Sequence, residues 1–167
     1  MSLMRHSLCL GSLLILLAAA AFARDVQNPS GLPIPRFVSL KSDEVNIRTG
    51  PGTRYPIQWV YRKEGWPVEV IEEFDHWRKI RDMEGTAGWA HKTMLDGRRT
   101  ALVRGKGPHT VRTDASDKAR PVLKAEPGVL CRLVECKREW CRVQVASRKG
   151  WLPKSALYGV YPQETFD

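Results

Sequence analysis

The stretch VNIRTGPGTRYPIQWVYRKEGWPVEVIEE, residues 45–73, decides the fold, together with WRKI at 77–80 and GTAGW at 85–89. Apolar side chains occupy every second position in parts of it, as at Val45 and Ile47. Such alternation is typical of a strand with one face in a core and the other in water. The same spacing recurs at Ile57, Trp59 and Tyr61, and at Val68 and Val70, where Glu69 between them is expected to face water.

Turn signals separate these strand-like segments. Gly and Pro bend the chain tightly, because Gly tolerates a positive φ and Pro fixes its own φ. Such turn signals lie at residues 49–52, with two Gly and one Pro, and at 63–65, 82–85 and 147–150, each of which ends in a Gly. After residue 23 no apolar pattern of helical period exceeds a couple of turns, although 92–95 and 154–157 suit one turn each. These features predict an all-β fold, a small barrel or a sandwich.

The chain also repeats itself. WRKI at 77–80 recurs 63 residues later as WCRV, and the GW at 88–89 recurs 62 residues later. Upstream, VNIRT at 45–49 matches HTVRT at 109–113. Landmarks in the same order at nearly constant spacing indicate a duplication. The predicted organisation is a leader at 24–35, a first domain at 36–97 and a second domain at 98–167, whose apolar tail helps the two domains to dock.

Composition and charge narrow the class of protein. The chain has 167 residues, 43% of them hydrophobic, with 27 Lys and Arg against 18 Asp and Glu, which excludes a disordered or collagen-like chain. Residues 24–97 carry 11 basic and 11 acidic side chains, whereas residues 98–167 carry 15 and 7. The basic second half favours anionic envelope polymers or lipid headgroups as partners. The alternative is a solvated surface that keeps a small domain soluble.

The first 23 residues have a different character. A basic start with Arg5 precedes the apolar residues 8–17, and Ala21-Phe22-Ala23 supplies small residues two apart. This is the layout of a secretory signal, and we expect cleavage after Ala23 and a periplasmic or secreted protein. The apolar run is shorter than the roughly 20 residues that span a bilayer, and the alternative is an uncleaved anchor.

The motifs of the first half resemble those of the bacterial Src-homology-3 (SH3b-like) domain. These are the opening NIRTGPG, a Gly before a strand, the WRKI strand and the closing GW. The second half keeps Arg112, Gly128 and its own GW, but has Asp-Ala-Ser at 114–116 where the first half has Gly-Pro-Gly at 50–52. The resemblance implies two tandem half-open β-barrels of five strands, without catalytic activity. It also implies a role beside cell-wall enzymes and a shallow groove for peptide or peptidoglycan-like ligands.

Catalytic and metal-binding patterns are missing from the sequence. His76, His91 and His109 have no spacing typical of metal ligands, and neither HExxH nor GxSxG occurs. The acidic clusters at 72–73 and 82–84 fall at predicted hairpin ends, where solvated turn residues are expected. We therefore expect a protein that is not an enzyme and needs no metal or cofactor.

Three cysteines lie in the second half: Cys131, Cys136 and Cys141. A hairpin turning at residues 138–139 sets Cys136 opposite Cys141 with Cα atoms roughly 4.5 Å apart, which a disulfide accepts. In an oxidising compartment we predict this bond, with Cys131 left as a buried thiol. The alternatives are a zinc site and a catalytic thiolate beside the neighbouring Arg and Lys residues.

Aromatic residues are the main clue to a binding site, because a barrel this small does not bury all of them and flat rings suit peptide and sugar contacts. The predicted ligand-binding residues are Arg48, Tyr55, Trp59, Tyr61, Trp77 and Trp89. The alternative for Trp77 and Trp89 is a structural role in the core. For Arg48 it is an ion pair with Asp43 or Glu44 that holds the loop.

The sequence favours a non-catalytic periplasmic module that binds a cell-envelope ligand, either peptidoglycan or a peptide. The basic second half would add attachment to the polymer or to anionic lipid headgroups. Because a secreted protein rarely meets nucleic acid, we do not expect nucleic acid to be a partner. The alternatives are an adaptor that regulates an envelope enzyme or sensor and, ranked last, an enzyme.

Overall fold

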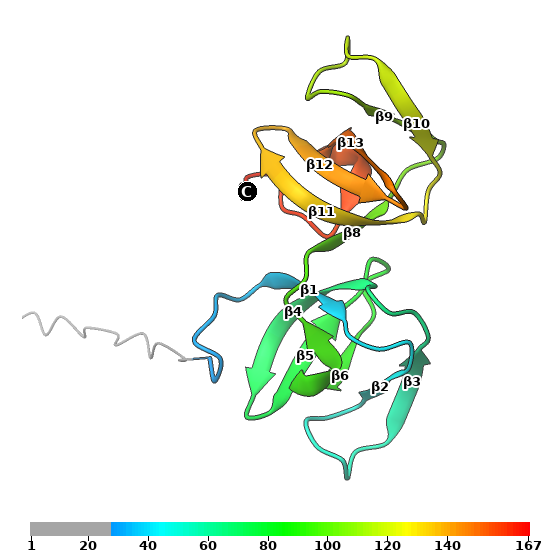
Figure 1. The fold of residues 1–167 in the computed structure, drawn as a ribbon. Coiled ribbons are helices and arrows are strands. Elements are labelled where there is room, and N and C mark those ends of the chain that lie inside the picture. Colours follow the sequence, from blue (N-terminus) through cyan, green and yellow to red (C-terminus); the bar gives the residue numbers. More distant parts are fainter. Residues whose placement is uncertain (1–27) are drawn as a thin grey trace, which may run out of the picture.

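The structure is a computed structural model that describes residues 28–167, and the predicted signal and its cleavage after Ala23 lie outside this range. The chain forms two antiparallel sheets of seven strands each, and Figure 1 draws them one above the other. This confirms the predicted all-β fold with two tandem units. Within residues 28–167, no helix has the length and apolar character needed to cross a membrane.

Corresponding strands occupy corresponding places in the two sheets. The order is β3-β2-β6-β5-β4-β1-β7 in the first domain and β10-β9-β13-β12-β11-β8-β14 in the second. The first domain contains β1 (Arg36–Leu40), β2 (Val45–Arg48), β3 (Ile57–Tyr61), β4 (Pro67–Phe74), β5 (Trp77–Arg81), β6 (Ala87–His91) and β7 (Leu95–Asp96). The second contains β8 (Thr100–Val103), β9 (His109–Arg112), β10 (Pro121–Ala125), β11 (Leu130–Lys137), β12 (Trp140–Val145), β13 (Arg148–Pro153) and β14 (Leu157–Tyr158). The predicted single turns are the 3-10 helices η1 (Lys92–Met94) and η2 (Lys154–Ala156).

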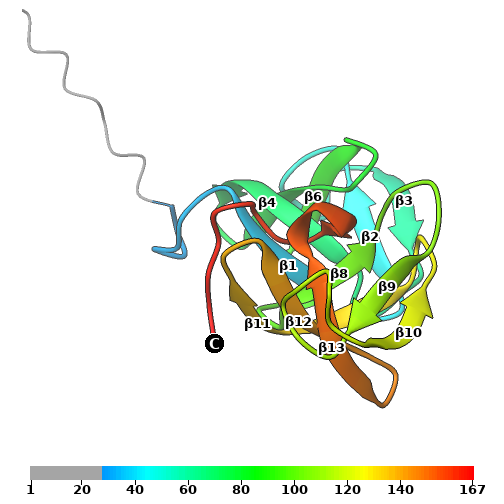
Figure 2. The same cartoon turned by 90° about the horizontal axis from the view of Figure 1, so that it is seen from above.

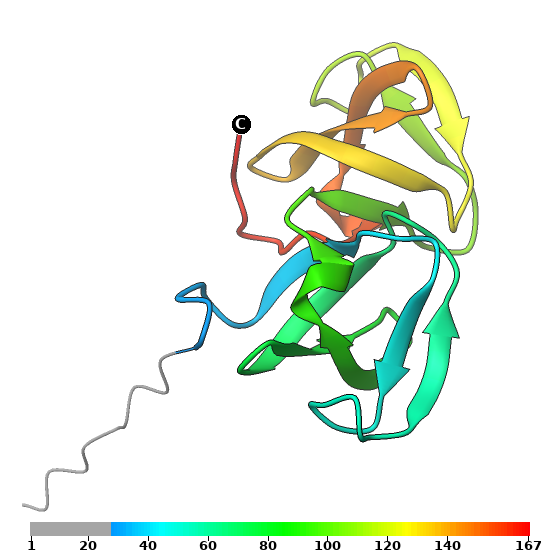
Figure 3. The ribbon, with the colours of Figure 1, turned by 60° about the horizontal axis from the view of Figure 1, so that its bottom comes forward.

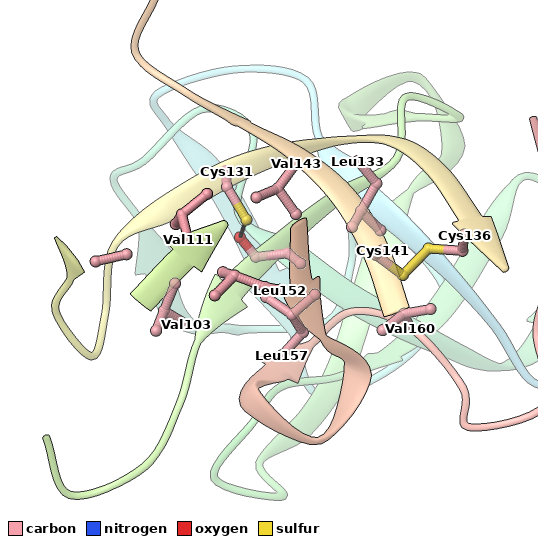
Figure 4. Close-up of a cluster of buried hydrophobic side chains, with 12 residues drawn as sticks. Val103, Val111, Cys131, Leu133, Cys136, Cys141, Val143, Leu152, Leu157 and Val160 are labelled. Carbon is pink, nitrogen blue, oxygen red and sulfur yellow. Dashed lines mark hydrogen bonds between the residues drawn. A yellow bond between two sulfur atoms is a disulfide. The ribbon is translucent and has the colours of Figure 1, made fainter. Parts of the chain in front are cut away.

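Each sheet curls around its own apolar core, as the period-two pattern requires. Val45 and Ile47 of β2 are fully buried in the first core. Figure 4 shows the second core, where Val111 of β9 and Val143 of β12 point toward Leu152. The alternation fails at Ile57, which is 47% exposed, because a register irregularity between β2 and β3 separates it from the core positions.

Two strands approach each other closely at the glycine of each GW pair. A Cβ on Gly150 would lie 2.6 Å from the carbonyl oxygen of Arg112, and one on Gly88 would overlap the side chain of Ile47. No side chain fits there without moving β13 away from β9 or β6 away from β2. This crowding explains why both repeats carry a Gly at this place.

The second domain contains the predicted disulfide. Cys136 lies opposite Cys141, and Lys137 opposite Trp140, with 4.1 Å between the cysteine Cα atoms. The bond leaves Cys131 as the free thiol of the described chain, so the three-cysteine zinc site does not form. Burial raises the pKa of the Cys131 thiol to about 12, which disfavours the catalytic thiolate.

Tyrosines of the C-terminal segment join the two domains. The rings of Tyr158 and Tyr161 lie 5.2 and 4.7 Å from the ring of Phe37 on β1. The Tyr161 hydroxyl donates to Glu69 of β4 at 2.8 Å, and the Tyr158 hydroxyl donates to the carbonyl oxygen of Arg81 at 3.2 Å. Figures 2 and 3 show this segment beside β1. Glu69 is therefore only 8% exposed, and the expectation that it faces water is wrong.

The C-terminal tail, which follows β14, binds to the second domain. Arg99 forms an ion pair with Glu164, and Lys154 Nζ donates to the carbonyl oxygens of Pro162 at 2.9 Å and Glu164 at 2.7 Å. Phe166 bridges to Cys136 by two backbone hydrogen bonds of 2.7 and 3.0 Å. Burial opposes ionisation of Glu164, but the hydrogen bonds from Arg99 outweigh it and lower its pKa.

Glu73 corrects the expectation that the acidic clusters are solvated turns. Its side chain is fully buried, where Arg36 at 2.5 Å and Arg78 at 3.0 Å pair with it. Ser30 of the leader donates to it through both its backbone N–H and its hydroxyl, at 2.9 and 2.7 Å. Burial disfavours the charged form, but the bonds from Ser30 and Arg36 prevail and lower the pKa of Glu73. The carboxylate fastens the leader to the first domain.

Candidate functional site

The candidate site lies on the outer face of the first domain, which we define as the side of the sheet turned away from its core. Because side chains alternate along a strand, Asn46 and Arg48 of β2 point outward while Val45 and Ile47 point inward. Trp77 of β5 is paired with His91 of β6, so their side chains share one face. These strands bring polar and aromatic groups together at one end of the sheet.

A pocket with a volume of ≈ 360 Å³ occupies this end of the face. Four elements build it, namely β2, the start of β5, the end of β6 and the turn η1, with Glu44 from the segment before β2 and Thr53 from the loop before β3. Its walls combine an indole, an imidazole, a guanidinium, a carboxylate, an amide and hydroxyls. The lining residues are Glu44, Asn46, Arg48, Thr53, Trp77, His91, Thr93 and Met94.

Trp77 and His91 form the aromatic wall of the pocket. Their ring centroids are 5.3 Å apart and the rings meet edge to face at 79°. The His76 ring also lies near His91, with ring centroids 6.0 Å apart. Both Trp77 and His91 are half-buried, so each keeps surface for a ligand. A partly exposed indole packs well against the apolar face of a sugar or an aliphatic side chain.

Hydrogen bonds fix the orientation of the His91 ring. Its Nδ1 lies 2.7 Å from the Thr93 hydroxyl and accepts from the Thr93 backbone N–H at 3.4 Å, which caps η1. In the neutral ring, an accepting Nδ1 leaves the proton on Nε2. The capping role holds the imidazole against Trp77 and leaves Nε2–H as the donor for a ligand.

Arg48 lines the pocket and also braces the loop beside it. Its Nη1 donates to the carbonyl oxygens of Thr53 at 3.1 Å and Tyr55 at 2.8 Å. It therefore holds the loop through backbone carbonyls, and Glu44 pairs instead with Arg62 at 3.0 Å. Arg112 makes the same contact in the second domain, donating to Ala119 at 2.8 Å. The repetition indicates that bracing is the shared role of this arginine and that lining the pocket belongs to Arg48.

The other predicted binding residues lie elsewhere. Trp59 and Tyr61 of β3 pack against the first core, and the Tyr61 hydroxyl donates to Asp82 at 2.7 Å. Burial, aided by the bond to Asp82, raises the pKa of Tyr61. Trp89 is 7% exposed, with Lys79 Nζ 5.9 Å from its ring centroid. The Tyr55 ring fills the space that a Cβ on Gly50 would need.

Of the six predicted residues, the structure thus places Arg48 and Trp77 in the pocket. Several lining residues were not predicted: Glu44, Asn46, Thr53, Thr93 and Met94, and His91, which was weighed only as a metal ligand. The alternation of β2 holds a signal for Asn46, since it shares a face with Arg48. The spacing of Trp89 and His91 likewise puts His91 on the outer face. Neither pattern indicates that the outer faces of β2 and β6 line one pocket together with Trp77 of β5.

Solved structures with a similar chain path come from larger proteins. NlpC2 from Trichomonas vaginalis is 10% identical with a TM-score of 0.36, and the match covers 79% of this chain and 51% of that one. NlpC1 from the same organism is 13% identical with a TM-score of 0.35, covering 88% and 50%. An NlpC/P60 family protein from Bacillus cereus is 14% identical with a TM-score of 0.33, covering 73% and 55%. This chain spans about half the length of each of these proteins.

Among curated proteins, none matches the chain in sequence. The profile of the bacterial SH3 domain matches it twice, at residues 41–97 and 105–159. The first match spans β2 to β7 and the second spans β9 to β14, so each sheet contains one match. Because the two matches together take up most of the chain and coincide with its two sheets, this protein belongs to the bacterial SH3 domain family as a tandem repeat of two such domains.

Proposed function

We propose that this protein is a non-catalytic binding module of the cell envelope, and that the pocket of its first domain takes a peptide-bearing cell-wall ligand. Membership of the bacterial SH3 domain family supports a role in binding cell-wall components. The observation that carries the proposal is the pocket itself, in which the Trp77 and His91 rings stand beside Asn46 and Arg48.

The chemistry of the walls favours a peptide. The Asn46 amide and the Thr53 hydroxyl, both exposed, can donate and accept, as the amide groups of a peptide do. The Thr93 hydroxyl donates to His91 and can still accept. Arg48 uses Nη1 on two carbonyls, and its remaining N–H groups can meet a carboxylate at the end of a peptide. Glu44 can meet an amine. The Trp77 ring offers an apolar wall for a side chain or sugar.

We also propose that the protein acts in the periplasm or outside the cell, after removal of residues 1–23. The basic start, apolar run and Ala21-Phe22-Ala23 support it. Mass spectrometry of the protein recovered from the producing cells tests it directly. A mass starting at Arg24 supports export and cleavage, whereas a chain retaining residues 1–23 contradicts cleavage.

Co-sedimentation with purified sacculi, together with titration of soluble wall peptides, tests the binding function. Trp77→Leu removes the aromatic wall, and we expect at least about tenfold weaker binding, in keeping with a central buried anchor. The control is Trp140→Leu, because Trp140 occupies the same place in β12 and is equally half-buried. Equal binding by the two variants would contradict the proposal that the pocket binds the ligand. Failure of sacculi to retain the wild-type protein, with capture of a single envelope protein, would favour an adaptor.

A further inference from the structure

We infer that the outer face of β11, β12 and β13 in the second domain is a second contact to the same wall polymer, and that it binds the polymer's carboxylates through Arg132, Arg142 and Lys149. This inference rests on the proposed function, because it takes the first domain to hold that polymer. We call these three residues the basic face. It is distinct from the pocket and lies in the other domain.

Strand register places the three side chains on one surface. Arg132 of β11 lies opposite Gln144 of β12, and Gln144 lies opposite Lys149 of β13. Arg142 is two residues from Gln144 on the same strand and therefore points the same way. Neighbouring positions across a sheet are about 5 Å apart, so Arg132 and Lys149 flank Gln144 and share one three-stranded surface with Arg142.

The three cations of the basic face form no close ion pair, although Glu135 lies opposite Arg142 in the sheet. All three residues are exposed, and none of them forms an ion pair among residues 28–167. At the matching places of the first domain, Glu69 pairs with Arg81 at 2.5 Å and Glu72 with Lys79 at 3.2 Å. In the second domain Arg132 and Gln144 stand in place of Glu69 and Arg81, while Glu135 lies opposite Arg142 and pairs with Lys137 at 3.4 Å. These positions are thus charge-balanced in the first domain and carry a net positive charge in the second.

The surroundings favour a polymer over a membrane. Binding at a lipid interface depends on apolar side chains that enter the acyl region as well as on charge. The exposed large apolar residues in the described part of the chain are Leu32, Ile57, Phe74 and Met83, all in the first domain or the segment before it. The basic face therefore has charge to offer but no large apolar group to insert. Guanidinium groups pair well with carboxylates, which wall peptides carry.

The energetics suit a second contact better than an independent site. Exposed charges each contribute less than about 1 kcal/mol, so three of them bind weakly on their own. Once the pocket holds a polymer, the second contact becomes intramolecular and a weak interaction adds to the affinity. The packing of Phe37 against Tyr158 and Tyr161 joins the two domains, which reduces the entropy lost when both bind.

The test compares two triple variants of the full chain in sacculus co-sedimentation. The first, Arg132→Gln with Arg142→Gln and Lys149→Gln, removes the basic face. The matched control, Lys41→Gln with Lys106→Gln and Lys118→Gln, removes three exposed charges from loops elsewhere. We expect the first to bind about tenfold more weakly at about 50 mM salt, with a flatter salt dependence, and the control to change less than about twofold. Equal effects of the two variants would overturn the inference.

Two further arms separate this inference from its alternatives. Vesicles with about 30% phosphatidylglycerol measure attraction to an anionic bilayer; we expect binding weaker than to sacculi, and equal or stronger binding would overturn the inference in favour of lipid. Trp77→Leu is measured beside the triple variants. If it weakens binding while the basic-face variant does not, the inference fails and the proposed function stands. If only the basic-face variant weakens binding, the pocket function fails and the basic face remains the wall contact.

Discussion

The two domains share one topology but present different outer faces. At one end of the sheet, Trp77 is paired with His91 in the first domain, whereas Trp140 is paired with Pro153 in the second. The first pair has an imidazole donor beside the indole, and the second has none. Since the strands are the same, the two domains differ in a few outward side chains, whereas the inward side chains form the same kind of core in both.

The row of residues nearest the domain junction differs in a second way. In the first domain Phe37, Glu69 and Arg81 lie side by side across β1, β4 and β5, and tyrosines of the C-terminal segment cover them. In the second domain the matching row contains Arg132 and Gln144, and Arg132 is exposed. The first domain covers this row in docking, whereas in the second domain Thr100 at the end of the row donates to the carbonyl oxygen of Gly65 at 2.7 Å and Arg132 stays exposed.

The two domains also hold the leader and the C-terminal tail in different ways. Glu73 lies opposite Arg78, and Cys136 lies opposite Cys141, at the same place in the matching hairpins β4–β5 and β11–β12. The ion pair fastens the leader through Ser30, whereas the disulfide strand fastens the tail through Phe166. The same position thus carries a pH-dependent link in one domain and a redox-dependent link in the other.

Glu73→Gln tests the ion pair and should have the largest effect. It leaves the Arg36 and Arg78 guanidinium groups partly unneutralised in a buried site, which we expect to lower the free energy of unfolding by about 4 kcal/mol. Urea denaturation at neutral pH measures it. Glu72→Gln, at an exposed carboxylate one residue away, is the control and should cost less than about 1 kcal/mol. A similar loss in both variants would refute the special role of Glu73.

The same variant should change the acid sensitivity. Because the folded-state pKa of Glu73 is lowered, its contribution is complete at neutral pH and is lost as the pH falls through that value. The wild-type protein should therefore lose more stability than Glu73→Gln between about pH 5 and pH 2. Parallel stability curves for the two proteins over this range would contradict the assignment.

Removing the disulfide should have an intermediate effect. The ring that it closes is short, so the double variant Cys136→Ser with Cys141→Ser should cost about 2 kcal/mol in the free energy of unfolding. Dithiothreitol should destabilise the wild-type protein by a similar amount and leave the variant unchanged. Cys131→Ser is the control for the free thiol, and its response to dithiothreitol should match that of the wild type. A reductant effect that persists in the double variant would point to another bond.

Tyr161→Phe should have the smallest effect. It removes the hydroxyl that donates to Glu69 but keeps the ring against Phe37, and we expect a loss of about 1 kcal/mol. Differential scanning calorimetry of the full chain measures it. Tyr55→Phe serves as the control because that ring packs within its own loop. No difference between the two variants would mean that the Tyr161–Glu69 bond adds nothing to docking.

Sequence patterns predicted the strands and the disulfide well because both depend on local order. The alternation of Val45 and Ile47 fixes which side of β2 meets the core. A turn at residues 138–139 fixes the partners of every residue in the hairpin, including Cys136 and Cys141. The candidate site was predicted only in part, since Trp77 and Arg48 share the pocket while Trp59 and Tyr61 pack on the core. Residues far apart in sequence meet there, and no local pattern encodes that meeting.

The sequence by itself determined that the chain is a repeated β unit, with a cysteine pair across one hairpin and an excess of positive charge in the second half. Only the tertiary structure decided that Glu69 is covered by Tyr161, that Glu73 is buried among arginines, and that Trp77 and His91 form a pocket wall. The reason is physical. Period and turn chemistry act between neighbours in the chain, whereas burial and ion pairing depend on how separate strands and two domains pack together.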